Sequence, residues 1–286
     1  MSDTILVPLF DILSFGAITV LIVIGLGVIA SMMGIFNFAQ GEFVLIGAYT
    51  TFLAYHAGWP VISGMMLAPL VAGVAGLVIE FTIIRRLYGR PISAMLATWA
   101  IGLAIRETVR ILTAGLYIAI PEPVGGSIVI GGASISAWRF VVLLVTVIVV
   151  AISWLVLSKT SFGLQVRASL ENPALARCSG LSTDFVYAAT FCFGTALAGL
   201  AGALVVPLFS LFADLGLRFL VQGFASVLIG GVGTFVGPIA GGAVIGVLGS
   251  SLPWVMSPVT ADVLIFILAI TFVKFRPMGL ISGRGV

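Results

Sequence analysis

The chain has 286 residues, of which 61% are hydrophobic and only 8% are charged. Soluble domains carry about 25% charged residues, so this composition excludes a soluble globular protein. The apolar runs are longer than the roughly ten-residue alternating segments of a transmembrane β-barrel, which favours helices. The net charge of +3 is typical of the Lys and Arg excess in cytoplasmic loops and does not indicate nucleic-acid binding. The sequence therefore predicts an all-α, polytopic membrane protein.

Apolar stretches follow one another along the whole chain. Six of them predict ordinary membrane-spanning helices, at residues 15–34, 43–57, 62–84, 93–112, 138–157 and 185–206. The Gly-rich stretch 219–251 predicts either two short spans or a re-entrant pair, and a last span is expected at 260–273. We therefore expect one transmembrane domain over residues 1–286, with about seven to nine helices, some of them broken or re-entrant.

The positive charges predict the orientation of the chain. Three clusters mark the cytoplasmic side, and these are Arg85, Arg86 and Arg90; Lys159, Arg167 and Arg177; and Lys274, Arg276 and Arg284. The residues before the first span include Asp3 and Asp11 but no Lys or Arg, so the N-terminus should lie outside and the C-terminus in the cytoplasm. This requires an odd number of crossings, either nine short ones or seven with a re-entrant pair. Segment 113–137 should lie outside and has the Gly, Pro and β-branched residues of a small hairpin.

A polar group of residues lies near the junction of the first two spans, in the motif NFAQGEF. Asn37, Gln40 and Glu42 either mark a break in the helix that faces a transport path, or form a cytoplasmic turn with Glu42 at a helix N-terminus. Thr98 and Trp99 are further candidates for lining a path. These alternatives stay open at the level of the sequence.

The segment GIFNFAQGEFVLI at 34–46 resembles GLRFLVQGFASVL at 216–228. Transporters are often built from repeats whose Gly-broken segments line the pathway, although apolar sequences also match by chance. The second segment adds Gln222 and Ser226 to the path candidates. The glycines of residues 228–246 predict close helix packing, a broken helix that lines a cavity, or both.

Three charged residues lie inside the span at 93–112. Arg106 and Arg110 are four apart on one helix face, and Glu107 precedes Arg110 by three, so the two can pair. We expect a buried ion network that fixes helix packing. A substrate or proton site is the alternative.

Several enzyme motifs are missing from the sequence. The only lysines, Lys159 and Lys274, do not lie in a phosphate-binding loop, and there is no H-E-x-x-H motif or Cys/His cluster that would bind zinc. His56 is the only histidine, and the sequence does not indicate a hydrolase triad around it. We expect no catalytic residue, no metal and no cofactor bound by this chain.

The longest polar segment reads QVRASLENPALARCSGL at 165–181, within a predicted cytoplasmic loop at about 158–183. Asn172 is suited to cap a short helix that begins with Pro173. A single helix-prone cytoplasmic loop in a membrane protein indicates a docking site for a soluble partner. The residues of interest in it are Arg167, Glu171, Asn172, Pro173, Ala176, Arg177 and Gly180.

These motifs together resemble the ABC-importer permeases of the branched-chain amino-acid class. The resemblance rests on the loop at 165–181, on NFAQGEFVLIGAY at 37–49, AGLAGAL at 198–204, GGVGTFVGPIAGG at 230–242 and RPMGL at 276–280. It covers nearly the whole chain, in the family's order. At Gln40 this chain departs from the family, which often has His there.

The resemblance implies a multi-pass permease of the bacterial inner membrane. Such a permease forms half of a pore with a second, related but different permease subunit, above two ABC ATPase subunits that use ATP and Mg, and it receives substrate from a periplasmic binding protein. The resemblance places Glu171, Asn172, Pro173, Ala176 and Gly180 in the loop that couples to the ATPases. It implies branched-chain amino acids, other amino acids, urea or short amides as substrates.

Two other functions compete with this one. A secondary transporter would couple to ions through Glu42, the Arg106–Glu107 pair or Asp262. A passive channel for small solutes would suit the Gly-rich stretch and the sparse charge. Neither needs a docking surface for a motor, so the loop at 158–183 favours the importer.

Overall fold

The computed structural model describes residues 3–33, 36–130, 133–231, 234–276 and 279–281. Gly34, Arg284 and parts of the motifs at 230–242 and 276–280 lie outside these residues. The described elements are α1 (Asp3–Met33), α2 (Gln40–His56), α3 (Val61–Thr82), η1 (Ile84–Leu87), α4 (Pro91–Leu112), β1 (Ser127–Ile130), β2 (Ala133–Ser136), α5 (Ala137–Lys159), α6 (Ser161–Glu171), α7 (Pro173–Cys178), α8 (Thr183–Val205), α9 (Leu215–Gly230), α10 (Val236–Ser251), η2 (Leu252–Trp254) and α11 (Pro258–Phe275).

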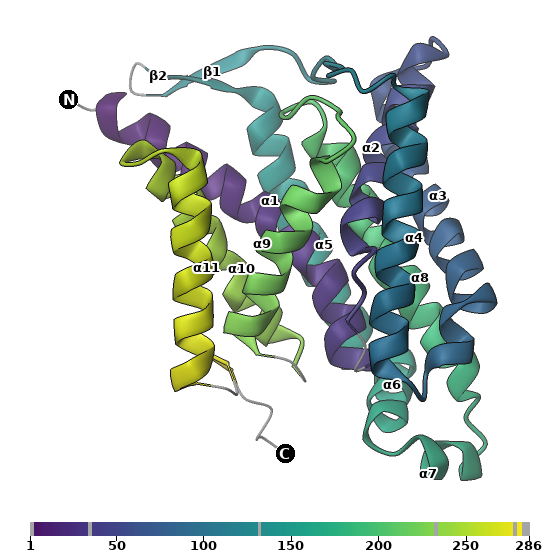
Figure 1. Ribbon diagram of the computed structural model, residues 1–286. Helices are drawn as coiled ribbons and strands as arrows, with labels where there is room; N and C mark the ends of the chain where they lie inside the picture. The colour runs from purple at the N-terminus through teal and green to yellow at the C-terminus, as the bar shows by residue number, and fades with distance from the viewer. Residues whose placement is uncertain (1–2, 34–35, 131–132, 232–233, 277–278, 282–286) are drawn as a thin grey trace.

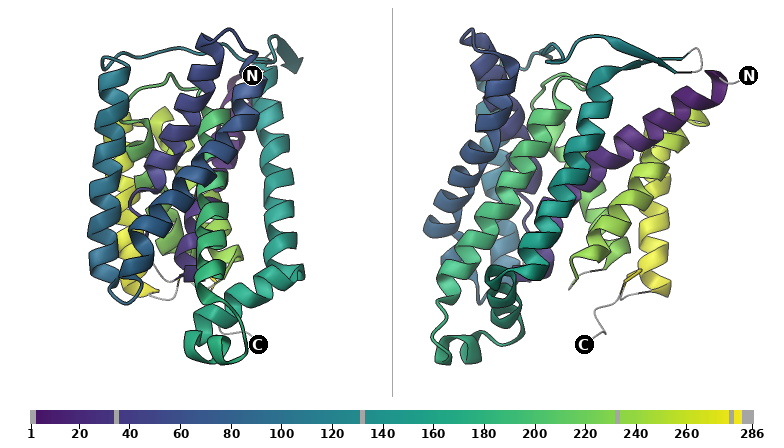
Figure 2. Two further views of the ribbon diagram at one scale, coloured as in Figure 1. Left: turned by 90° about the vertical axis from the view of Figure 1, so that its right-hand side faces the viewer. Right: turned by 180° about the vertical axis from the view of Figure 1, so that it is seen from behind.

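The described helices form an all-α bundle of membrane-spanning length, as the sequence predicts. Helices α1 to α5 and α8 to α11 run along the bundle in alternating directions, so that α1 begins at one end and α11 finishes at the other (Figures 1 and 2). Six helices among the described residues are long and apolar enough to cross a membrane. The shorter α2, α9 and α11, of 17, 16 and 18 residues, run beside them.

Most of the predicted spans agree with the helices to within a few residues. The exception is α1, which begins at Asp3 rather than at residue 15 and includes Pro8 in its interior. The opposite ends of α1 and α11 agree with an odd number of crossings. The prediction that the N-terminus lies outside and the C-terminus in the cytoplasm stays a prediction.

The Gly-rich stretch forms two helices, α9 and α10, which cross the bundle as a pair. The chain after α11 returns to the last turn of α9, where the Leu280 amide donates to the Ile229 carbonyl at 2.8 Å. The ends of α9 and α11 therefore lie at the same end of the bundle. This favours two short spans over a re-entrant pair, and thus nine crossings among the described residues.

Helix α8 lies at the centre of the bundle and packs against α1, α2 and α3. It approaches α2 so closely that a Cβ atom at Gly202 would overlap the Val44 carbonyl, and one at Gly47 would overlap Gly199. Small residues permit this contact between backbones. The motif AGLAGAL is therefore a packing surface.

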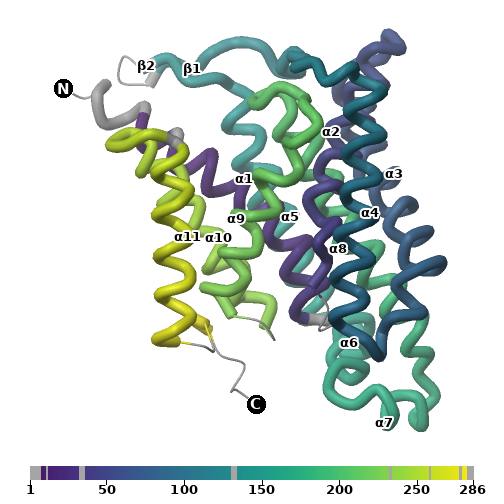
Figure 3. Tube along the Cα trace, in the orientation of Figure 1, coloured from purple at the N-terminus to yellow at the C-terminus, as the bar shows by residue number. Residues whose placement is uncertain are grey.

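Helix α2 begins inside the bundle rather than at its end (Figure 3). Its approach segment lies against the middle of α4, where a Cβ atom at Gly102 would contact Glu42, Ala39 and Phe38. Asn37 Oδ1 accepts from the Ala39 amide at 3.0 Å and Thr98 Oγ1 accepts from the Phe38 amide at 3.1 Å. These two side chains accept hydrogen bonds from backbone amides that precede α2 and therefore have no partner within the helix.

A β-hairpin covers the end of the bundle where α1 begins. Strands β1 and β2 pair antiparallel, with Ser127 opposite Ser136, which confirms the small hairpin expected in segment 113–137. The Ser136 hydroxyl then accepts from the Trp138 amide at 3.2 Å and caps α5.

Helix α4 buries only one narrow stripe of its surface. The stripe consists of small and polar residues, namely Ala94, Thr98, Gly102, Arg106 and Val109. Their spacing of three or four residues places them on one face. That face packs against the broken start of α2, and among the described helices none packs extensively against the rest of α4.

Candidate functional site

A buried ion pair joins the start of α2 to the upper half of α4. Arg106 donates from Nε to Glu42 Oε1 at 3.0 Å, and a second guanidinium nitrogen bonds the same oxygen. Both side chains are buried, and Glu42 Oε2 has no partner within the part of the chain that the structure describes. The two charges compensate each other where neither is well solvated.

The network continues from α4 to the N-terminus of α9. Arg110 bonds Glu107 at 2.9 Å and both oxygens of Asp214 at 2.8 and 3.0 Å, while Arg106 Nε lies 3.9 Å from Asp214. The pairing of Glu107 with Arg110 is as predicted, but the expectation that this pair is buried is wrong, because both side chains reach the surface of the isolated chain. The sequence did not identify Glu42 and Asp214 as the partners of Arg106 and Arg110. Ionised side chains in apolar surroundings normally pair with opposite charges, so such partners are expected.

Most of this network is exposed in the isolated chain, on the face formed by α2, α4, α9 and α11. We call this face the front face, since it is turned to the viewer in Figure 1. The side chains of Glu107 and Asp214 are each 51% exposed and that of Arg110 is 42% exposed. Only Arg106 and Glu42 are shielded.

The polar residues at the break before α2 bond mainly to each other and to backbone. Asn37 Nδ2 donates to Gln40 Oε1 at 3.1 Å, and Gln40 Nε2 donates to the Gly194 carbonyl of α8 at 3.1 Å. Asn37, Gln40 and Glu42 are fully buried. Glu42 is therefore not at an exposed turn, and the role of these residues in a path stays a prediction.

The other path candidates lie on α4 and α9. Trp99 is 42% exposed and meets the ring of Phe38 edge-on, while Phe38 stacks on Phe224 of α9 with centroids 4.8 Å apart. Gln222 is only 5% exposed, and its Oε1 has no partner among the described residues. Ser226 is fully buried and donates to the Gln222 carbonyl of its own helix.

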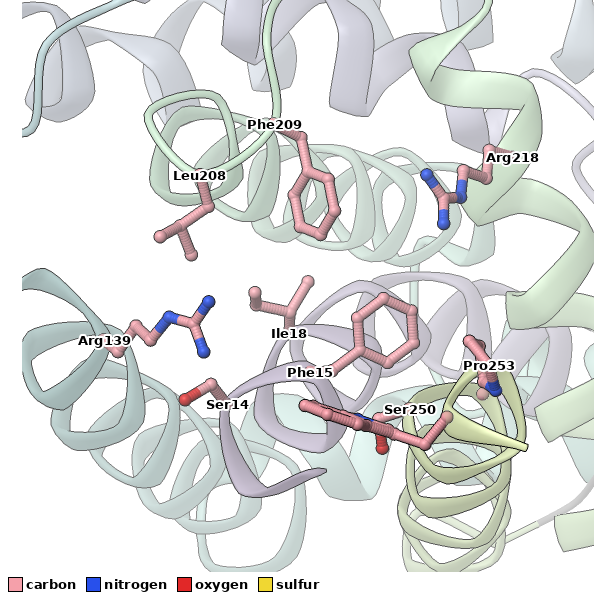
Figure 4. A pocket seen from close by; sticks show the side chains of 11 residues that line it. Ser14, Phe15, Ile18, Arg139, Leu208, Phe209, Arg218, Ser250 and Pro253 are labelled. Atoms are coloured by element: carbon pink, nitrogen blue, oxygen red, sulfur yellow. The ribbon is translucent and has the colours of Figure 1, made fainter. Parts of the chain in front are cut away.

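Two cavities open beside α9, near the end of the bundle where this helix begins. The first, of about 280 Å³, lies between α1, α5, α9 and η2, and Figure 4 shows Arg139 and Arg218 pointing into it from opposite sides. The second, of about 350 Å³, lies between α9 and α11 and is lined by Asp214, Arg218, Gln222 and Asp262 among apolar side chains. Arg218 lines both cavities.

The polar loop forms two short helices, α6 and α7, that project beyond the end of the bundle where α11 finishes (Figures 1 and 3). Asn172 Oδ1 accepts from the Leu175 amide at 3.0 Å, and Pro173 opens α7, which confirms the predicted cap. Gly180 has a φ of +84°, a backbone conformation that favours glycine. It ends α7 as a C-terminal cap.

Side chains of α6 and α7 hold this loop to the bundle while others face outward. Arg167 donates to the Leu157 carbonyl at 2.6 Å, and Arg177 Nε donates to Thr183 at 2.8 Å. Ala176 is buried, whereas Glu171 and Leu175 are exposed beside a cavity of about 520 Å³. The loop thus presents an open apolar and acidic surface on a fixed support.

A second hydrogen-bonded chain connects α6 to α3. Tyr187 of α8 donates to the Ser169 carbonyl at 2.9 Å and packs edge-on against Tyr88, whose hydroxyl bonds the buried carboxylate of Glu80. Burial, and then the bond to Glu80, raise the pKa of the Tyr88 phenol above its ordinary value of 10.0, so it stays a donor at neutral pH. The sequence places Glu80 near the end of a predicted span and suggests a structural role, and its partner Tyr88 follows in the same chain segment as the C-cap of η1.

The described residues contain no group of three or more His, Cys, Asp and Glu side chains that could hold a metal ion.

The profile of the "branched-chain amino acid transport system / permease component" family matches residues 9–273. The chain belongs to this family. It is therefore an ABC-transporter permease and a multi-pass protein of the inner membrane.

Individual permeases are similar to this chain over most of its length. The high-affinity branched-chain amino acid transport system permease protein LivH of Escherichia coli is 26% identical, over 96% of this chain and 94% of its own length. BraD of Pseudomonas aeruginosa, a permease protein of the same description, is 28% identical over 94% and 93%. The fructose import permease protein FrcC of Rhizobium meliloti is 24% identical over 83% and 66%.

Proposed function

We propose that this permease forms half of the pore of an ATP-driven, binding-protein-dependent importer, with branched-chain amino acids as its substrates. The relatives LivH and BraD are named for that transport, which supports the substrate. FrcC is named for fructose import, so overall similarity leaves other solutes, including other amino acids, urea and short amides, as alternatives.

The charged front face supports a pore that is shared with a second permease subunit. Charged side chains in membrane-spanning segments are costly against lipid and normally face protein or a water-filled cavity, and Glu107, Arg110 and Asp214 are exposed in the isolated chain, toward the end of α4 and the start of α9. Water or protein must therefore cover this face. A second, related permease that faces the front face would provide both, as the wall of a water-filled path.

The observation that carries the ATP-driven function is the structure of the α6–α7 loop. The loop is exposed, capped and fixed, and it lies at the end of the bundle where α3 and α11 finish, which carries the described residues of the positive clusters, Arg85, Arg86 and Arg90 and Lys274 and Arg276 among them. We propose that segment 158–183 couples the pore to two ABC ATPase subunits, which would use ATP and Mg. A periplasmic substrate-binding protein would deliver the solute at the opposite end. This chain itself would carry no catalytic residue.

The test uses the complete transporter in proteoliposomes, with uptake and ATP hydrolysis measured together. Glu171→Lys should reverse the charge of the docking surface, and Gly180→Trp should disturb the end of α7, so both should hydrolyse ATP with little uptake. Gly58→Trp is the matched control, because Gly58 has a φ of +82° with no atom nearby, at the other end of the bundle. It should keep the wild-type ratio of uptake to hydrolysis.

Other results would favour other functions. Normal coupling in both loop variants would remove the coupling role of segment 158–183. Uptake without ATPase subunits that collapses with an uncoupler would indicate an ion-coupled secondary transporter. Solute flux through liposomes that contain this chain alone would indicate a passive channel.

A further inference from the structure

Two of the three charged side chains that line the cavity between α9 and α11 have opposite signs and do not pair with each other. Arg218 lies in the first turns of α9 and is exposed, and its only partner among the described residues is the ring of Phe209, 5.6 Å from its Cζ. Asp262 lies in the second turn of α11 and is half-buried, and its side chain has no hydrogen bond or ion pair with any described residue. The third charged residue of the lining, Asp214, pairs with Arg110 instead.

A buried amide lies in the wall of the same cavity. Gln222 is 5% exposed, and its Oε1 is without a partner among the described residues. A buried amide oxygen that lacks a hydrogen bond is destabilising, by about 1–3 kcal/mol. Such an amide is satisfied when a ligand brings a donor. Gln222 follows Arg218 by one helical turn, so both side chains lie on the same face of α9.

Apart from Asp214, the remaining lining of the cavity is apolar. It is formed by Val221 and Ala225 of α9, Ile265 and Phe266 of α11, and Phe212 and Leu217 beside them. The volume of about 350 Å³ is at the small end of the roughly 300–1,000 Å³ typical of ligand sites. One small molecule with an apolar part fits this lining.

We propose that this cavity binds a zwitterionic α-amino acid with an apolar side chain on its way through the pore, a proposal that rests on the importer function above. Arg218 binds the carboxylate, Asp262 binds the ammonium group, and the Gln222 oxygen accepts a hydrogen bond from that ammonium. The aliphatic side chain contacts Val221, Ala225 and Ile265. Urea and short amides lack both charges and leave Arg218 and Asp262 unpaired, so the site disfavours them.

The test measures ligand binding by saturation-transfer NMR on the complete transporter in nanodiscs without binding protein. Three probes are used at a pH where amines are protonated, namely L-leucine, L-leucinamide without the carboxylate, and 4-methylpentanoate without the ammonium group. In the wild type, leucine should bind best. Losing one charge-assisted contact should weaken binding about tenfold or more.

The variants Arg218→Gln and Asp262→Asn should show opposite patterns. Arg218→Gln should lose its advantage for leucine over leucinamide, and Asp262→Asn should lose its advantage for leucine over 4-methylpentanoate. Gln222→Leu should weaken leucine and leucinamide but spare 4-methylpentanoate. Arg86→Gln, at the other end of the bundle, is the control and should bind all three like the wild type.

Wild-type uptake in proteoliposomes separates the two proposals. If the complete wild-type transporter moves leucine but Arg218→Gln and Asp262→Asn bind all three probes like the wild type, the site assignment is wrong and the importer function stands. If the wild type moves no solute with its partners, the importer function fails first. Urea serves as a fourth probe of the wild type. Equal binding of urea and leucine would also overturn the site assignment.

Discussion

Helices α4 and α5 both lie at the outside of the bundle, and their exposed surfaces differ. Apart from Arg139 and Lys159 near its ends, α5 presents an apolar surface, with Val147 65% exposed and Ile152 52% exposed. Helix α4 exposes the charged Glu107 and Arg110 beside Leu103 and Trp99. Two exposed surfaces of unequal polarity indicate different surroundings, lipid for α5 and a protein or aqueous surface for the charged side of α4.

The comparison extends to the way each helix is held. Trp138 at the start of α5 donates to the Leu204 carbonyl, and the rest of the buried stripe of α5 packs mainly through apolar side chains. Helix α4 is held through Thr98, Gly102 and Arg106 against the broken start of α2. The two helices are therefore held by different kinds of contact, mainly apolar packing for α5 and buried polar contacts for α4.

The largest expected effect comes from breaking the Glu42–Arg106 pair. Arg106→Met leaves Glu42 buried and uncompensated, which costs about 3–5 kcal/mol. The variant should give much less folded protein in fluorescence-detected size-exclusion chromatography and a lower Tm in detergent. The double variant Glu42→Leu with Arg106→Met should recover most of the stability. A single variant as stable as the wild type would contradict the compensation of these charges.

The next effect comes from adding the same charge to each helix near mid-depth. Val147→Asp on α5 should cost about 2.5–3.5 kcal/mol if lipid surrounds it, and should reduce the amount of folded transporter in the membrane. Leu103→Asp on α4 should reduce it far less. Quantitative immunoblots of purified membranes compare the two. Equal losses would remove the distinction between the two helices.

Most of the fold could be predicted from the sequence, because hydropathy and charge are local signals. The span at 93–112 agrees with α4, the Asn172 cap was found, and the Glu107–Arg110 pair follows from helical spacing. The sequence left undecided whether α2 begins within the bundle or at its end, since a helix break and a cytoplasmic turn have the same composition. Only the fold shows what lies next to it.

Contacts between distant segments could not be predicted. Glu42 is 64 residues from Arg106, and Arg110 is 104 residues from Asp214, so no helical spacing connects them. The sequence suggested Asp262 only as an ion-coupling residue of the alternative secondary transporter, and Arg218 was not singled out. Their shared cavity depends on α9 and α11 lying side by side.

The most direct test of the central claim is the accessibility of single cysteines on the two helices. Cys178 and Cys192 are replaced by Ala, and Leu103→Cys or Val147→Cys is introduced into the assembled transporter. Leu103 lies one turn from Glu107 on the same face of α4. A water-soluble, charged thiol reagent added during ATP turnover should modify Leu103→Cys and leave Val147→Cys unmodified. Modification of Val147→Cys alone, or of both at the same rate, would contradict the front face as the wall of the pore.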